Sequence, residues 1–337
     1  MRVVSLFDGM ACGYEALKRA GITPSLYYAA EIDKYAIQIA KKNHPWIIHM
    51  GDVTQWREWN IDWSKIDLLI GGSPCQGFSF AGKQLAFDDP RSKLFFVYVD
   101  ILNHIKSVNP NVKFLLENVK MKKEYLAVIS EQLGVQPTFV NSSLVSAQNR
   151  QRYYWANWEF EQPEDKGILL KDVLEDKPND FTLMSDTFVN RQQERKCLID
   201  ETKEKAASLS AMEYVKNGRQ GDYLACDIKG GRITGRFLID GVRQDGKMDS
   251  VAGLTTQRLE VREDDKSNCI STVQKDSIVV QVDDLHYRKL TPLECERLQT
   301  LPDRYTEGVS STQRYRMLGN GWTCDVVAHI FRSLPKC

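Results

Sequence analysis

Short apolar runs alternate with segments of helical periodicity over the first 157 residues of the chain. The runs are rich in β-branched residues and predict strands, whereas apolar positions that recur every three or four residues predict helices. The expected elements are strands at 2–7, 26–31, 67–70 and 113–116, and helices at 14–20, 34–42, 91–107 and 122–133. Strands that alternate with helices predict an α/β fold with a mostly parallel sheet and helices on both faces.

The pattern changes near residue 159. From 159 to 285 the chain is polar, with Gly-Arg and Asp-Gly pairs and short β-branched pieces, which predicts a smaller domain of strands and loops. Helical signals return after 286, where Thr291-Pro292-Leu293-Glu294 is typical of a helix start. We therefore expect a large domain built from 1–158 and 286–337, and a second domain at 159–285.

Composition restricts the class of protein without naming a partner. The 45 basic and 45 acidic residues cancel, but a neutral total leaves room for a local basic surface that binds nucleic acid. Eight scattered cysteines without a C-x-x-C pair argue against a zinc site and a disulfide framework, and fit reduced thiols in the cytoplasm. No apolar run reaches membrane length. We expect a soluble cytoplasmic protein without a metal.

Glycines and acids follow the first three predicted strands. The turn Phe7-Asp8-Gly9-Met10-Ala11-Cys12-Gly13 lies between the first strand and helix, Glu31 ends the second strand, and Asp52 ends a third. Glycines allow close backbone approach to a ligand, and an acid about 20 residues later suits ribose hydroxyls. The turn alone could be simple loop chemistry. The three together predict an adenosine-containing cofactor, and S-adenosylmethionine fits better than NAD because G-x-G-x-x-G is absent.

Three further segments carry candidate chemistry. Cys75 follows Pro74 in a Gly/Ser loop just after a buried strand, Glu117 and Asn118 follow the next strand, and Gln148-Asn149-Arg150-Gln151-Arg152 could direct its arginines to one face. Each has a plain alternative: a buried small cysteine, a helix-capping carboxyl, or a solvated strand face. A last segment, Arg316-Met317-Leu318-Gly319-Asn320-Gly321-Trp322, is expected to be a turn that opens the final helix.

These segments, with RKLTPLECERLQTLPD near the C-terminus, resemble the C5-cytosine DNA methyltransferases in order and spacing. The resemblance covers 1–157 and 286–334. It implies a Rossmann-like fold dependent on S-adenosylmethionine, with 159–285 as a target-recognition domain. The implied reaction transfers a methyl group to C5 of a cytosine flipped out of double-stranded DNA, and the implied enzyme is a monomer. Ala11 stands where the family commonly has glycine, which affects the local loop geometry.

The resemblance also assigns residues. Cys75 would attack C6 of the cytosine, Glu117 would contact N3 with help from Asn118, Arg152 would contact O2 and Glu117, and Arg150 would order the Cys75 loop. The cofactor residues it implies are Phe7, Asp8, Gly9, Gly13, Glu31, Ile32, Asp52, Val53, Pro74, Asn320 and Gly321.

DNA contacts are expected from two places. The loop 76–90 would close over the base, with Gln76, Ser79 and Lys83 near the DNA. Arginines in the second domain, on glycine-rich loops, suit guanine edges and phosphates, and Arg232, Arg236 and Arg258 are the candidates. Three other functions remain open: an RNA cytosine methyltransferase on the same fold, a DNA-binding relative without catalysis, and a nucleotide methylase that uses a folate.

Overall fold

A computed structural model describes residues 1–73, 93–175, 182–183, 228–239, 242–243, 255–262, 264–270, 278–281 and 286–335. The expected site residues Pro74, Cys75, Gln76, Ser79 and Lys83, with the rest of the loop 76–90, lie outside these ranges.

The larger sheet has seven strands in the spatial order β3-β2-β1-β4-β5-β7-β6. They are β1 (Arg2–Leu6), β2 (Leu26–Ala30), β3 (Ile48–Gly51), β4 (Leu68–Gly71), β5 (Lys113–Val119), β6 (Thr138–Asn141) and β7 (Gln151–Ala156). The pairs among β1 to β5 are parallel, and β7 runs antiparallel between β5 and β6. The expected mostly parallel sheet is confirmed.

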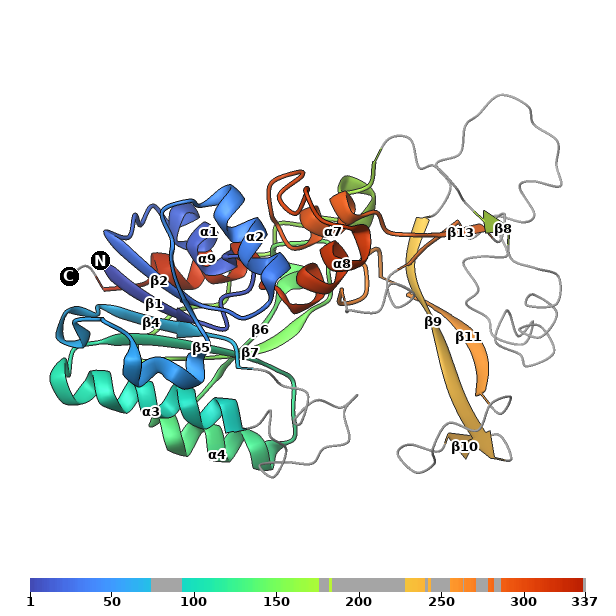
Figure 1. Cartoon of the computed structure of the whole chain (residues 1–337). Helices are drawn as coiled ribbons and strands as arrows, with labels where there is room; N and C mark the ends of the chain where they lie inside the picture. Colours follow the sequence, from blue (N-terminus) through green and yellow to red (C-terminus); the bar gives the residue numbers. More distant parts are fainter. Residues whose placement is uncertain are drawn as a thin grey trace, which may run out of the picture.

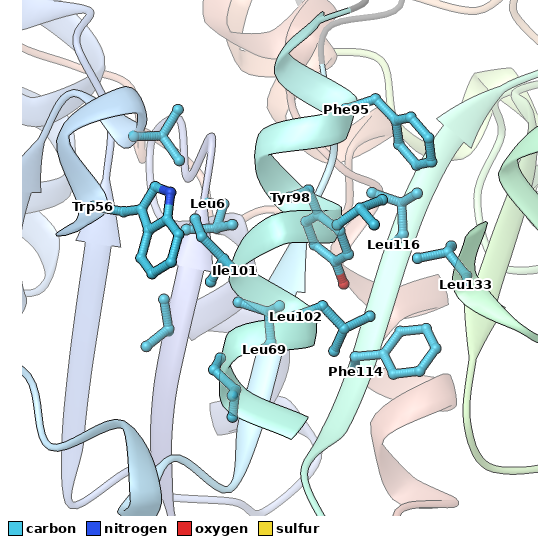
Figure 2. Packing of buried hydrophobic residues seen from close by; sticks show 14 of the residues in the cluster. Leu6, Trp56, Leu69, Phe95, Tyr98, Ile101, Leu102, Phe114, Leu116 and Leu133 are labelled. Atoms are coloured by element: carbon cyan, nitrogen blue, oxygen red, sulfur yellow. The ribbon is translucent and has the colours of Figure 1, made fainter. Parts of the chain in front are cut away.

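Helices cover both faces of this sheet (Figure 1). One face carries α1 (Cys12–Arg19), α2 (Lys34–Asn43) and α9 (Cys324–Arg332), and the other carries α3 (Lys93–Val108) and α4 (Lys123–Leu133). Buried side chains of α3 recur at helical spacing and pack on the strands below, as Phe95, Tyr98 and Leu102 do in Figure 2. Full burial of each such side chain stabilises the fold by about 1.5–3 kcal/mol. This gain explains why α3 packs its apolar face against the sheet.

The strand order of the larger sheet indicates where a ligand would bind. The chain moves outward from β1 through β2 to β3, and then returns to β4 and moves outward the other way to β5. β1 and β4 therefore lie side by side at the point where the strand order reverses. Loops after these two strands diverge to opposite faces and leave a crevice, which is where open α/β sheets bind ligands.

The second sheet is antiparallel. It contains β8 (Thr182–Leu183), β9 (Ile228–Ile239), β10 (Val242–Arg243), β11 (Thr255–Val261), β12 (Ile278–Gln281) and β13 (His286–Lys289). The ribbon of β9 and β11 extends away from the larger sheet (Figure 1). The expected β-rich character is confirmed. However, Arg232, Arg236 and Arg258 were expected on loops, and this was wrong: they lie in β9 and β11, whose backbones pair over seven residues.

Helices at the end of the chain complete the larger unit. α7 (Pro292–Leu298) starts as expected, with Pro292 in its first turn and a capping box between Thr291 and Glu294. α8 (Ser311–Asn320) runs through Gly319 and Asn320, so the turn before α9 is shorter than the sequence suggested and begins at Gly321. None of the helices in the described part of the chain is long and apolar enough to cross a membrane.

Parts of the range 159–285 pack with the larger unit. Leu170, Val173 and Ile270 belong to the same buried cluster as Met10 and Ile39. The backbone of Ser267 pairs with that of Ala147 and Asn149, with N–O distances of 2.7 and 3.0 Å. Gln148 is fully buried between these segments; it accepts from the Ile270 N–H at 2.8 Å and donates to the Leu298 carbonyl at 3.1 Å. These contacts join the two regions of the chain.

Candidate active site

A cavity of about 490 Å³ lies at the carboxyl ends of β1 to β5. Its walls contain every described residue that the sequence suggested for the cofactor and for catalysis: Phe7, Asp8, Gly9, Gly13, Glu31, Ile32, Asp52, Val53, Glu117, Asn118, Arg150, Arg152, Asn320 and Gly321. The structure therefore brings together residues from both ends of the sequence. A volume of this size suits a small molecule.

The loop after β1 adopts a left-handed backbone at alternate residues. The φ angles of Phe7, Gly9 and Ala11 are 57°, 61° and 68°. This conformation turns the chain sharply and directs the Gly9 N–H to Oε2 of Glu31, at 2.8 Å. Ala11 keeps the left-handed geometry that glycine adopts more easily, at a cost on the order of 1 kcal/mol. Ala11 is therefore compatible with the sharp turn that the sequence predicted here.

Glu31 is held by three backbone N–H groups. Besides Gly9, the amides of Ile32 and Asp33 both donate to Oε1 at 2.8 Å. These bonds fix the carboxylate at the tip of β2, beside the cavity. The Ile32 side chain is 74% exposed and lines the same cavity, so an apolar surface is available to a flat ring.

Asp8 is a buried acid in the cavity wall. The Tyr27 hydroxyl donates to its Oδ1 at 2.6 Å, while its buried Oδ2 has no hydrogen-bond partner. Burial raises the pKa of Asp8 to about 7, and the hydrogen bond from Tyr27 offsets only part of this rise. An unpaired buried carboxyl oxygen is costly, and a cationic ligand would compensate it.

Asp52 and Val53 form the cavity wall beyond β3. Asp52 caps the short 3₁₀ helix η1 (Val53–Glu58) by accepting from the Thr54 amide at 2.9 Å. Val53 is buried and faces the same cavity as Ile32. The two apolar side chains are thus presented by the ends of adjacent strands.

Glu117 receives two partners at the end of β5. Nε of Arg152 lies 2.8 Å from Oε1 in an ion pair, and the Trp322 indole N–H donates to Oε2 at 3.1 Å. The contact between Arg152 and Glu117 expected from the resemblance is present. It arises because β7 pairs antiparallel with β5, with Val119 opposite Arg152.

Asn118 joins the ends of β4 and β5. Its Nδ2 donates to the Ser73 hydroxyl at 3.2 Å and its Oδ1 accepts from the Val119 amide at 2.8 Å. Successive side chains of a strand point to opposite faces of the sheet, so the side chains of Glu117 and Asn118 point in different directions. Asn118 thus anchors Ser73, the residue directly before Pro74 in the sequence.

Arg150 is buried and makes four bonds. Nη2 donates to the carbonyls of Gly319 and Gly321, at 3.1 and 2.8 Å, and Nη1 donates to the Ile270 carbonyl and to Sγ of Cys269, both at 3.1 Å. It therefore fixes the turn between α8 and α9, which forms one wall of the cavity. Its expected effect on the Cys75 loop concerns residues outside the described ranges.

Sequence patterns assigned no role to three residues of this site. Trp322, Ser73 and Cys269 touch Glu117, Asn118 and the two arginines respectively. Trp322 lay in a segment singled out only as a turn, and no local pattern marks Ser73 or Cys269. Among the described residues no group of His, Cys, Asp and Glu could hold a metal ion.

The doubly wound sheet, with a cavity at the carboxyl ends of its strands, defines the class of Rossmann-like α/β proteins. The profile of the C-5 cytosine-specific DNA methylases matches residues 1–336, and the chain belongs to this family. It is a DNA (cytosine-5-)-methyltransferase.

Characterised relatives match over nearly the whole chain. The orphan methyltransferase M.SPRI of Bacillus phage SPR is 27% identical and covers 99% of this chain and 97% of its own. The type II methyltransferase M.NlaX of Neisseria lactamica is 28% identical, with 98% and 94% covered.

Solved structures share the fold at low identity. Entamoeba histolytica EhMeth is 17% identical with a TM-score of 0.61, covering 99% of this chain and 97% of that one. S. pombe Dnmt2 is 18% identical with a TM-score of 0.57, covering 98% and 97%. These likenesses extend over both sheets.

Proposed function

We propose that this protein transfers a methyl group from S-adenosylmethionine to C5 of a flipped cytosine in a specific double-stranded DNA sequence. One observation carries the proposal: a single cavity is lined both by the acids and glycines at the ends of β1 to β3 and by the Glu117–Arg152 pair at the end of β5. A cofactor bound on the first side would face a base bound on the second.

The walls of the cavity fit the cofactor. Glu31 would hold the ribose hydroxyls, and Ile32 and Val53 would sandwich the adenine, with Asp52 beside its amino group. Asp8, with its unpartnered oxygen, would meet the positively charged methionine end. The remaining wall would come from Phe7, Gly9, Gly13, Pro74, Asn320 and Gly321. When bound, S-adenosylmethionine supplies a methyl group activated by a positive sulfur.

Cys75 is the proposed nucleophile. C5 of cytosine is too weak a nucleophile to take a methyl group directly, so a thiolate first adds to C6 and makes C5 electron-rich. C5 would then displace the sulfonium sulfur from the methyl carbon, with the bonding pair left on sulfur. Loss of the C5 proton to a base and cleavage of the Cys75–C6 bond would restore the ring. Cys75 lies two residues after Ser73, which Asn118 anchors at the rim of the cavity.

Glu117 would donate a hydrogen bond or a proton to N3 and so stabilise the negative charge that enters the ring. Arg152 holds one of its oxygens and is the proposed contact to O2 of the base. Arg150 supports the opposite wall through the carbonyls of Gly319 and Gly321. Donors and acceptors that are fixed before the base arrives need little reorganisation during the reaction.

The base must leave the DNA stack to reach this cavity, at a cost of a few kcal/mol. We propose that 76–90 closes over it, with Gln76, Ser79 and Lys83 near the DNA. The range 159–285 is the proposed target-recognition domain. In its ribbon, β11 pairs Arg258 with Thr234, midway between Arg232 and Arg236, so these three positions share one face.

The relatives bear on the biological setting. M.SPRI is an orphan phage enzyme, whereas M.NlaX is a type II methyltransferase. We propose a modification, orphan or phage enzyme that acts as a monomer on DNA in a bacterial or infected cytoplasm.

The experiment is covalent trapping. Purified protein is incubated with S-adenosylmethionine and DNA duplexes that carry 5-fluorocytosine, which blocks loss of the C5 substituent. We expect a protein–DNA adduct that resists denaturant in the wild type and in Cys337→Ser, and none in Cys75→Ser, which should still bind cofactor. Methylated positions in DNA from expressing cells then identify the target sequence. Methyl transfer to tRNA but not to DNA, or wild-type rates in Cys75→Ser, would contradict the proposal.

A further inference from the structure

Cys269 touches both arginines of the site. Sγ of Cys269 is 3.1 Å from Nη1 of Arg150 and 3.8 Å from Nη2 of Arg152, and it lies 3.5 Å from the Ile270 carbonyl. A thiol can donate its S–H to this carbonyl while its lone pairs accept from both guanidiniums. The proposed reaction uses Cys75 and assigns no step to Cys269.

The position of this sulfur is set by the backbone. Ser267, two residues before Cys269, pairs with Ala147 and Asn149, and the amide of Ile270 donates to the buried Gln148 side chain at 2.8 Å. A cysteine has a single side-chain torsion that places its sulfur, whereas an arginine has four and loses more conformational entropy when it is fixed. Cys269 is therefore the rigid partner in its contacts with the arginines.

Electrostatics favour the same arrangement. Two guanidiniums close together repel each other unless an electron-rich group lies between them. Burial alone would raise the pKa of the Cys269 thiol, but the charges of Arg150 and Arg152 hold it below its ordinary value. The two positive charges therefore favour the thiolate form of Cys269 over the thiol more than burial alone would allow.

We propose that Cys269 is a positioning residue for methyl transfer: its sulfur holds the Arg152 guanidinium so that Nε stays against Glu117. The proposal rests on the function proposed above. Through Arg150 the same sulfur is linked to the carbonyls of Gly319 and Gly321, so one atom connects the base side of the cavity to its cofactor side. A plain core cysteine would fill space without this connection.

A double-mutant cycle tests the link to Arg152. We expect Cys269→Ala to lower kcat about tenfold with KM for S-adenosylmethionine changed less than about twofold, and Cys269→Ser to recover most of the loss. In an Arg152→Ala background, Cys269→Ala should have no further effect. Cys295→Ala, at a buried cysteine in α7, is the control for lost volume and should leave kcat unchanged. Equal effects of Cys269→Ala in both backgrounds, or none in either, would overturn the proposal.

A second readout does not depend on turnover. The alkylation rate of Cys269 by iodoacetamide, followed by peptide mass spectrometry across pH, reports the pKa of its thiol. We expect this pKa to rise in Arg150→Ala and in Arg152→Ala, and an unchanged value in both would refute the contact. If the wild type transferred no methyl groups to DNA while these shifts were present, the proposed function would fail and the arginine–sulfur contact would stand.

Discussion

Trp322 and Glu117 lie 205 residues apart in the chain, yet the Trp322 indole N–H donates to Oε2 of Glu117 at 3.1 Å. The other carboxyl oxygen is paired with Arg152. The carboxyl group is thus gripped on both oxygens, by β7 on one side and by the turn before α9 on the other. Its orientation toward the cavity depends on all three elements.

Removal of the indole donor should reduce catalysis more than stability. Trp322→Phe keeps an aromatic ring but loses the bond to Glu117, and we expect kcat to fall at least about tenfold, since hydrogen bonds to charged groups contribute roughly 1.5–3 kcal/mol. Trp155→Phe is the matched control, because its indole N–H donates at 3.0 Å to Ser130 of α4, away from Glu117. That variant should lower Tm and leave kcat unchanged. A Trp322→Phe enzyme with wild-type kcat would show that the contact has no catalytic role.

Two neighbouring glycines at the end of β4 should separate activity from stability. A Cβ at Gly72 would lie 2.9 Å from Nε1 of Trp322 and 3.0 Å from Oε2 of Glu117. We therefore expect Gly72→Ala to displace both groups and to lower kcat by more than about tenfold, with only a small change in Tm.

Gly71→Ala is the contrasting variant. Its Cβ would lie 3.0 Å from the Leu6 carbonyl and 3.1 Å from the Tyr98 ring, inside the core. Overpacking of this kind costs about 1–3 kcal/mol, so Tm should fall. The interpretation fails if Gly72→Ala loses as much stability as Gly71→Ala.

Glu31→Gln should weaken cofactor binding. The carboxylate accepts from three backbone amides, whereas a glutamine amide would present its NH₂ group to at least one of them. We expect the Kd for S-adenosylmethionine, measured by calorimetry, to rise about tenfold or more. At saturating cofactor, kcat should change little. Glu58→Gln, an exposed residue of η1, should bind as the wild type does; equal affinity in Glu31→Gln would remove Glu31 from the binding site.

Asp8 should make stability depend on pH in an unusual direction. Its native pKa of about 7 lies above the ordinary value of 3.8 because the carboxyl is buried. Between these values the native state holds a proton that the unfolded state has lost, so this group lowers stability as pH rises from about 4 to 7. His44 acts oppositely: burial lowers its pKa to about 4, so stability rises with pH from about 4 to 6.5.

Asp8→Asn should remove the opposing contribution of Asp8 and leave that of His44. Free energies of unfolding measured by denaturant at several pH values should rise more steeply with pH in the variant, by up to about 1.4 kcal/mol per pH unit. Asp62→Asn is the control, since hydrogen bonding from Ser64 holds the pKa of that exposed carboxyl below its usual range, outside the window. Parallel profiles for the wild type and Asp8→Asn would show that Asp8 titrates normally.

The local hydrophobic pattern was sufficient to predict most of the larger sheet. The apolar runs predicted β1, β2, β4 and β5 within about three residues of their observed ends, and the periodicity predicted α3 and α4. β6 and β7 were not predicted, because QRYYWA mixes polar and aromatic residues and reads as a strand only between β5 and β6. Short strands were expected in this range, but Arg232, Arg236 and Arg258 were placed on loops because the glycines of β9 break the usual strand composition.

The residues of the site also fall into two groups, those that the sequence predicted and those that only the structure revealed. The sequence by itself determined the residues that follow the strands, such as Asp8, Glu31 and Glu117, because parallel strands all end at one edge of the sheet. Only the tertiary structure decided that Trp322 meets Glu117 and that Cys269 meets Arg150 and Arg152. The physical reason is that these contacts join separate elements. Hydrophobic periodicity predicts local structure, and it carries no information on which distant side chains meet in the folded protein.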